Sequence, residues 1–193
     1  MIQLGDEKTV LEDHLRELHL PTVRSSFEEM ARGAEQETLS YERYLLELTE
    51  RECQVRRQNR VERLLRQSKL PLEKDLTGFD LKRLPAKIAR QVRTLLDGTF
   101  VDRKENLLAF GKPGSGKTHL LCAIGQELIR NIRKVYFSSC SLMVQELLIA
   151  KRDLKLSRLL KRLAGYDALI LDDLGYVQQS REEMEVLFTL LAE

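Results

Sequence analysis

Residues 111–118 read GKPGSGKT and match the pattern GxxxxGK[ST], in which a glycine-rich turn precedes a lysine and a hydroxyl residue. Small residues let successive backbone N–H groups converge on phosphate oxygens, and the helix that follows adds the positive end of its dipole. Lys117 is expected to reach the β- and γ-phosphates of a nucleotide, and the Thr118 hydroxyl is expected to ligate Mg²⁺. The residues that we expect to contact the nucleotide are Gly111, Lys112, Pro113, Gly114, Ser115, Gly116, Lys117, Thr118 and His119.

The sequence on either side of this turn is typical of an α/β fold. LLAF (107–110) precedes the turn and predicts a short buried strand, and an apolar helix follows to about Arg130. KVYFS (134–138) and ALILD (168–172) predict two further strands. Helical stretches are predicted at 141–149 and 154–163. Short apolar strands that alternate with helices imply a parallel sheet with helices on both faces, a context that disfavours a chance glycine-rich turn.

Two neighbouring acids end the third predicted strand, in ALILDDLG (168–175). Asp172, 55 residues after Lys117, is expected at the carboxyl edge of the sheet, where it would hold Mg²⁺ directly or through water. Asp173 is predicted to be catalytic, together with Lys117, by accepting a proton from an attacking water or by orienting it. The alternative for Asp173 is a helix or turn cap. For His119 we favour packing or hydrogen bonding in the first helical turn over the role of a catalytic base.

The first part of the chain reads as helices. Thr9 and Glu12 form a capping box that predicts the start of a first helix, and Pro21 suits the first turn of a second. A third helical segment runs from about Ser40 to Lys69. After it, prolines and glycines indicate the end of the helical pattern and a linker into a second domain. The sequence therefore predicts a small all-helical domain over residues 1–69 and an α/β domain over residues 70–193, with the boundary near residue 70.

Charge is unevenly distributed along the chain, although the net charge is only +2. Residues 1–50 carry 5 basic and 12 acidic residues, whereas residues 51–104 carry 15 and 7. An acidic head before a basic middle indicates two functional surfaces, of which one would suit a polyanion. The alternative is a solvated helical surface with a local bias in charge.

Two predicted helices each place a row of basic residues opposite an apolar face. The predicted DNA contacts are Arg56, Arg60 and Arg63 in the first row, and Lys151, Lys155, Arg158 and Arg162 in the second. Rows of this kind suffice to bind phosphates without reading sequence, and neither row contains the aromatic residues that base stacking would need. A solvated helix face would look the same, so for one row alone we would favour that interpretation.

The segments NLLAFGKPGSGKTHL and DALILDDLG resemble the AAA+ ATPases of the replication-initiator and helicase-loader branch, and they are most similar to the IstB-like transposition helper family. KDLTGFDLKRLP (74–85) is similar to the segment that enters the ATPase core of that family. The resemblance implies an AAA+ P-loop core over residues 70–193 that binds ATP and Mg²⁺ and hydrolyses ATP, with Asp173 associated with water activation. It also implies that Leu76 to Phe79 lie near the adenine.

By this resemblance, we expect a regulator of DNA transposition that assembles on double-stranded DNA as a homo-oligomer when full length, helps to select or deform the target and engages a transposase. One alternative is a helicase loader whose head holds a replicative helicase. Another is a nucleotide-gated adaptor that hydrolyses little ATP. We expect no membrane partner and a cytoplasmic location, because the sequence has no long apolar run and no signal-peptide pattern at its start.

After the acid pair, the sequence holds one more predicted helix, opened by a capping box of Ser180 with Glu183. AAA+ enzymes of the kind that this chain resembles continue with a sensor strand, an arginine that reaches a neighbouring subunit and a small helical region. We find no candidate segment for these elements, and Arg181 is expected to be an exposed first-turn residue. We therefore expect the 193 residues to be a fragment that binds nucleotide weakly, hydrolyses it negligibly and assembles poorly.

Overall fold

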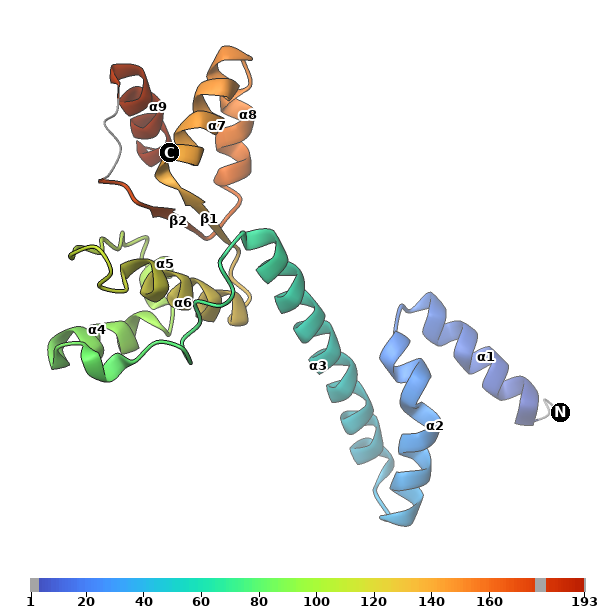
Figure 1. Cartoon of the computed structure of the whole chain (residues 1–193). Coiled ribbons are helices and arrows are strands. Elements are labelled where there is room, and N and C mark those ends of the chain that lie inside the picture. Colours follow the sequence, from blue (N-terminus) through green and yellow to red (C-terminus); the bar gives the residue numbers. More distant parts are fainter. Residues whose placement is uncertain (1–3, 176–179, 193) are drawn as a thin grey trace. The chain divides into compact units, whose positions relative to one another are not determined.

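The computed structural model describes residues 4–175 and 180–192 (Figure 1). Its helices before the glycine-rich turn are α1 (Leu4–Glu17), α2 (Pro21–Gln36), α3 (Tyr41–Ser68), the 3-10 helix η1 (Leu81–Arg83), α4 (Ala86–Leu95) and α5 (Thr99–Asp102). From the turn onward the elements are α6 (Lys117–Arg130), β1 (Val135–Ser139), α7 (Cys140–Arg152), α8 (Leu156–Leu163), β2 (Ala168–Asp172) and α9 (Arg181–Ala192). Helices and a parallel strand pair make this a mixed α/β structure.

The chain divides into two compact units, residues 1–60 and 61–193, and the division falls within α3. Leu64 and Leu70, which flank the end of α3, both belong to a hydrophobic cluster of the second unit. The sequence-based division into a helical domain over 1–69 and a nucleotide-binding domain over 70–193 stays a prediction.

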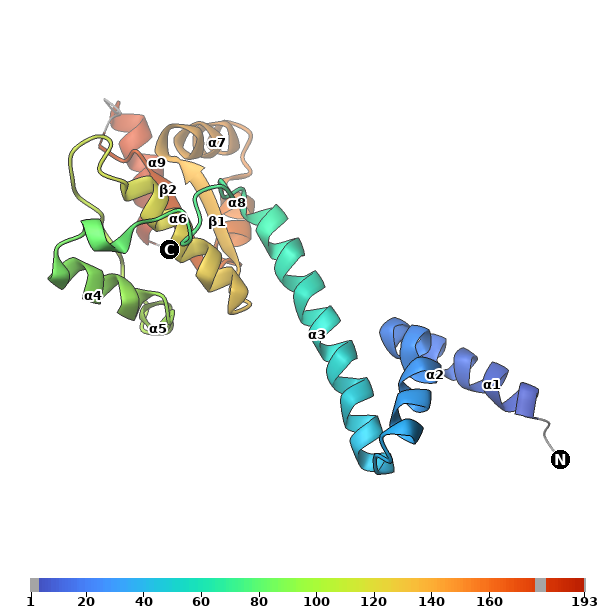
Figure 2. The same cartoon turned by 60° about the horizontal axis from the view of Figure 1, so that its bottom comes forward.

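In the first unit, α1, α2 and the start of α3 share a small core around Leu15, Val23 and Leu48 (Figure 2). The Tyr44 hydroxyl donates a hydrogen bond to the Phe27 carbonyl oxygen at 3.0 Å, which ties α3 to α2. Pro21 occupies the first turn of α2, as its fixed φ angle predicts. The predicted start of the first helix at Thr9 is wrong, because α1 already begins at Leu4 and Thr9 lies inside it.

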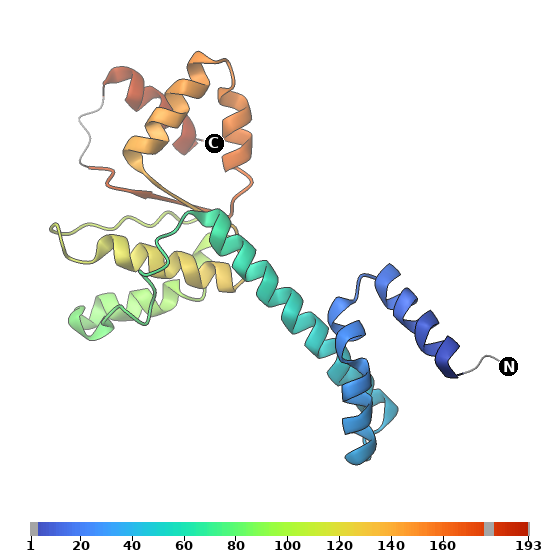
Figure 3. The ribbon, with the colours of Figure 1, turned by 45° about the vertical axis from the view of Figure 1, so that its right-hand side comes forward.

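The two strands of the second unit pair in parallel, from Val135 opposite Ala168 to Ser139 opposite Asp172. Because side chains alternate along a strand, the sheet contributes to two different cores. Phe137 and Ile170 pack in the cluster that contains the buried residues of α6, whereas Tyr136 and Leu169 pack in the cluster formed by α7, α8 and α9. Figures 1 and 3 show these two groups of helices on opposite sides of the strands, which confirms the predicted parallel sheet with helices on both faces.

The predicted strand at 107–110 is wrong. These residues have no regular secondary structure, and Leu108 and Phe110 are 66% and 89% exposed. A strand is stabilised by hydrogen bonds to a neighbouring strand, and among the described residues the sheet consists of β1 and β2 alone. The apolar stretch before the turn thus has the composition of a strand but no strand partner.

Other predicted elements are found with small changes of boundary. β2 has the predicted bounds and α6 ends at Arg130, whereas β1 starts one residue later than predicted. The capping box of Ser180 with Glu183 is confirmed, since each residue's side chain accepts a hydrogen bond from the other's backbone N–H, at 3.3 and 2.6 Å. In the described part of the chain, no helix is long and apolar enough to span a membrane.

Candidate functional site

The glycine-rich turn leads directly into α6, whose N-terminal end carries Lys117 and Thr118. Gly116 precedes the helix with a φ of 87°, a left-handed conformation that glycine adopts without strain. The Lys117 ammonium group donates hydrogen bonds to the carbonyl oxygens of Gly111 at 3.0 Å and Lys112 at 3.1 Å, so it lies across the loop. Gly111 to Ser115 are exposed. The loop therefore presents its backbone and one ammonium group at the positive end of a helix, an arrangement suited to phosphate.

α6 is held close to the sheet, and this fixes the position of the loop. Gly125 of α6 has no side chain to separate the helix from β2, since a Cβ atom at this position would lie 2.8 Å from Ile170 Cδ1. Cys122 and Ile129 of the same helix are fully buried. Packing of this kind places the first turn of α6 beside the carboxyl end of β2.

The carboxyl end of β2 meets the start of α6 through one hydrogen bond between side chains. The Thr118 hydroxyl donates to Asp172 Oδ1 at 2.9 Å, which joins residues 54 positions apart in the sequence. Both side chains are half-buried. The two residues that we expected to hold Mg²⁺ therefore lie in contact.

The donor chemistry of this pair fits magnesium. Mg²⁺ prefers oxygen ligands and is commonly bound by one or two protein oxygens together with phosphate oxygens and waters. The Thr118 hydroxyl and the Asp172 carboxylate supply two such oxygens. No group of three or more His, Cys, Asp or Glu residues suited to a metal occurs among the described residues, so a cage built from the protein alone is not found there.

Asp173 follows β2 in a conformation that is unusual for its place in the chain. Its φ is 59°, and it is exposed. Six other described residues that are not glycine also have a positive φ. All six follow the end of a helix: His19, Thr38, Lys69, Lys104, Ile132 and Leu154. Among the described residues, Asp173 is the one that adopts this conformation after a strand. Backbone strain of this kind is often found at functional sites.

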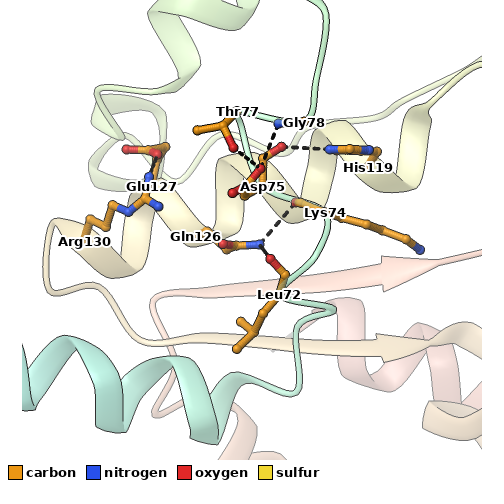
Figure 4. A network of polar contacts seen from close by, with 9 residues as sticks. All are labelled: Leu72, Lys74, Asp75, Thr77, Gly78, His119, Gln126, Glu127 and Arg130. Carbon is orange, nitrogen blue, oxygen red and sulfur yellow. Dashed lines mark hydrogen bonds and ion pairs between the residues drawn. The ribbon is translucent and has the colours of Figure 1, made fainter.

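The segment that follows α3, residues 71–79, runs against α6 and is called the strap below (Figure 4). His119 Nε2 lies 2.7 Å from the backbone oxygen of Asp75, and since that oxygen only accepts, Nε2 carries the proton. The His119 ring also faces the ring of Phe79, with 5.3 Å between the centroids. His119 is thus engaged by the strap, and its predicted contact with the nucleotide stays a prediction.

Phe79 lies against the start of α6. A Cβ atom at Gly116 would lie 3.1 Å from Phe79 Cε2, and Phe79 itself is half-buried. From the sequence, Phe79 was expected near the adenine only by family resemblance. Its packing on Gly116 places an aromatic ring beside the glycine-rich turn.

Gln126 is a residue of the site region that sequence reasoning missed. It is 5% exposed on α6, and its side-chain amide faces three carbonyl oxygens of the strap. One weak signal was available, since Gln126 and the neighbouring Glu127 interrupt the apolar residues of CAIGQELI (122–129).

The basic residues predicted to form a row on α3 differ in whether their side chains are already bonded within the chain. Arg56 donates to the buried carboxylate of Glu52 at 2.6 Å and also bonds to the His19 carbonyl oxygen. Arg60 and Arg63 are exposed. Arg56 is therefore engaged in holding the first unit together.

Three residues of the second row, Lys155, Arg158 and Arg162, line a groove of about 600 Å³ between α7 and α8, and Lys151 does not. Arg162 pairs with Glu146 at 3.3 Å, and Lys151 pairs with Glu185 at 3.1 Å. Lys155 and Arg158 are exposed at the groove, which Glu146 also lines. Of the four predicted contacts, Lys155 and Arg158 are the best placed to meet a phosphate backbone.

Comparison with known proteins gives one family match and several relatives. A family model described as IstB-like ATP binding protein matches residues 13–193. An ATP-binding protein of insertion sequence IS5376 from Geobacillus stearothermophilus is 34% identical over 185 residues, 96% of this chain and 74% of the relative. An insertion-sequence ATP-binding protein of Sinorhizobium fredii is 37% identical over 92% of this chain, and that of IS21 from Pseudomonas aeruginosa is 34% identical over 94%. The chain spans 60% of the Sinorhizobium protein and 68% of the Pseudomonas protein.

Proposed function

The chain belongs to the family of IstB-like ATP-binding proteins, and we propose that it is an AAA+ ATPase that regulates DNA transposition. In this proposal it binds ATP and Mg²⁺, assembles with further copies on double-stranded DNA, helps to select or deform the target and engages a transposase. The names of its relatives, which associate ATP binding with insertion sequences, favour this function over the loading of a replicative helicase.

The observation that carries the proposal is the contact between Thr118 and Asp172 beside the loop crossed by Lys117. The glycine-rich turn supplies backbone N–H groups for phosphate, and a hydroxyl and a carboxylate brought together at its edge suit the metal of a nucleotide. Mg²⁺, when bound, would neutralise charge that develops on the phosphates. The Lys117 ammonium group would face the β- and γ-phosphates, and the backbone N–H groups of the turn would bind their oxygens.

Asp173 is proposed to activate or orient the water that attacks the γ-phosphate. It follows Asp172 directly and is exposed, so its carboxylate is accessible to a water at the same edge of the sheet. The strained backbone conformation described above supports a role beyond that of a turn cap.

DNA contact is proposed through the sugar-phosphate backbone. Lys155 and Arg158 offer two exposed charges at the α7–α8 groove, and Arg60 and Arg63 offer two on α3. Basic side chains without stacked aromatics are suited to sequence-independent binding.

A binding experiment tests the proposed function. Affinity for a labelled DNA of unrelated sequence is measured by fluorescence anisotropy, double-stranded and single-stranded, with and without Mg²⁺ and ATP. The proposal predicts tighter binding to the duplex and a further gain with ATP. Equal affinity for both forms of DNA, unaffected by ATP, would contradict it.

A further inference from the structure

A side-chain amide of α6 donates to backbone oxygens of the strap, one of which, the Pro71 carbonyl oxygen, also accepts from the Lys74 N–H at 3.2 Å. Three carbonyl oxygens of the strap, those of Pro71, Leu72 and Lys74, converge on one point at 3.4, 3.3 and 3.2 Å from Gln126 Nε2. Carbonyl oxygens only accept, so the group among them must be a donor, and this fixes the orientation of the Gln126 amide (Figure 4). Because Gln126 is 5% exposed, water has little access to replace it.

The remainder of the strap is ordered by successive contacts up to Phe79. The Asp75 carboxylate accepts hydrogen bonds from the Gly78 N–H and the Thr77 hydroxyl, both at 2.8 Å. These two bonds hold the pKa of Asp75 below its ordinary value. The Asp75 backbone oxygen accepts from His119, which is about two turns of α6 away from Gln126. The strap is thus attached to α6 at two points, and Phe79 follows the second of them.

We propose that Gln126 is a positioning residue of the nucleotide site: it pins the strap on α6 and so holds Phe79 beside Gly116, where the ring forms a wall for the base of the nucleotide. The inference rests on the proposed binding of ATP and adds how the base side of the site is built. Gln126 does not touch the nucleotide in this account. Its effect passes through the strap to Phe79, a half-buried aromatic residue of the kind on which a base can stack.

Different residues are proposed to contact the phosphates and the base of the nucleotide. Lys117 and Thr118 are the residues proposed to bind phosphates, and their side chains bond to the glycine-rich turn and to Asp172. The hydrogen bonds that join the strap to α6 instead involve Gln126 and His119. Loss of the Gln126 donor is therefore expected to weaken binding of ATP while leaving binding of inorganic tripolyphosphate, which has no base, nearly unchanged. A residue that merely stabilises the fold would affect both ligands alike.

The test uses the full chain and isothermal titration calorimetry with ATP and with tripolyphosphate, each with Mg²⁺. Gln126→Met keeps the length of the side chain and removes the donor, and Gln145→Met, at an exposed position of α7, is the matched control. With one or two net hydrogen bonds lost, we expect affinity for ATP to fall about fivefold to tenfold. Affinity for tripolyphosphate should change by less than about twofold, and the control should match the wild type.

Phe79→Leu provides a second variant, which keeps the hydrogen bonds of Gln126 to the strap and an apolar side chain at position 79. Like Gln126→Met, it is expected to lower the ratio of the affinity for ATP to the affinity for tripolyphosphate. An unchanged ratio of the two affinities in both variants, or an equal loss for both ligands, would overturn the positioning role. A third variant, Lys117→Ala, tests the proposed nucleotide site itself. If this variant bound tripolyphosphate as tightly as the wild type does, the proposed nucleotide site would be wrong, and the positioning role of Gln126 would be wrong with it.

Discussion

Glu52 is a buried carboxylate whose removal should loosen the first unit of the chain. It is 3% exposed on α3 and accepts hydrogen bonds from the backbone N–H groups of Thr22 at 2.8 Å and Val23 at 3.0 Å. These groups belong to the first turn of α2, where the backbone has no acceptor of its own. Arg56 adds a third bond to the same carboxylate. One side chain of α3 therefore caps α2 and binds the arginine that reaches the end of α1.

The expected cost of Glu52→Ala follows from these contacts. A hydrogen bond to a charged group contributes about 1.5–3 kcal/mol, and donors left unpaired in a buried position add a penalty. Arg56 is half exposed and regains water, so we count chiefly the two backbone donors and expect a loss of about 3 kcal/mol in local stability. Amides of α2 that exchange by local opening should then exchange about a hundredfold faster.

Hydrogen exchange followed by mass spectrometry measures this change on peptides that cover α2. Glu50→Ala is the matched control, since Glu50 is an exposed residue of the same helix. The control should exchange like the wild type. If Glu52→Ala also exchanged like the wild type, the assignment of Glu52 as the cap of α2 would be refuted.

The same carboxylate gives this region a dependence on pH. Burial alone would raise the pKa of Glu52, but the hydrogen bonds from Arg56, Val23 and Thr22 outweigh it and lower the pKa below its ordinary value. The stabilisation is therefore complete above the pKa of an unfolded glutamate, about 4.3, and is lost as the pH falls through the lower value of the folded chain. Glu52→Gln, which cannot ionise, should remove this part of the acid dependence of exchange in α2.

Three further predictions concern the proposed activities and the thiols. Asp173→Asn should retain ATP binding and, in a full-length protein, slow the release of phosphate in the presence of DNA. Loss of ATP binding, measured by calorimetry, would show that the role given to Asp173 is wrong. Lys155→Ala with Arg158→Ala should weaken DNA binding about equally for unrelated sequences and lower the slope of log affinity against log salt by about two, whereas the exposed control pair Lys82→Ala with Lys87→Ala should not. A thiol reagent should label Cys53 in the native chain and the two buried cysteines only after unfolding. Rapid labelling of all three cysteines before unfolding would contradict the packing of α6 and α7.

Burial explains the thiol prediction. Cys122 is fully buried on α6, and burial raises the pKa of its thiol to about 11, so little reactive thiolate forms near neutral pH. Cys140 is also fully buried, whereas Cys53 is exposed on α3.

The parts of the site that the sequence could predict are those in which local pattern and chemistry agree. The string GKPGSGKT identified the turn, and the apolar run that ends in Asp172 identified the strand. Asp172 was expected at the carboxyl edge of the sheet, and its contact with Thr118 agrees with that position, although the strand predicted before the turn is not found. The predicted roles of both residues with nucleotide and metal stay predictions.

Other features depended on contacts that no local pattern reveals. LLAF (107–110) has the composition of a strand, but strand formation requires a partner elsewhere in the chain. The strap bonds to Gln126, which lies more than 50 positions away, and only the position of this polar residue directly after the apolar stretch LLCAIG hinted at a partner. Arg56 looked like part of a cationic row, although Glu52, four residues before it, is at the spacing of a helical ion pair and could have indicated another role.

The central claim, that this turn binds ATP through Lys117, is tested most directly by titrating the full chain with ATP and Mg²⁺ in a calorimeter. Lys87→Ala, an exposed lysine on α4, serves as the control for loss of one positive charge. We expect saturable binding by the wild type and the control, and affinity weaker by about tenfold or more in Lys117→Ala, because one ammonium group proposed to bond to phosphate is removed. Equal affinity in Lys117→Ala and the wild type, or no binding by the wild type, would contradict it.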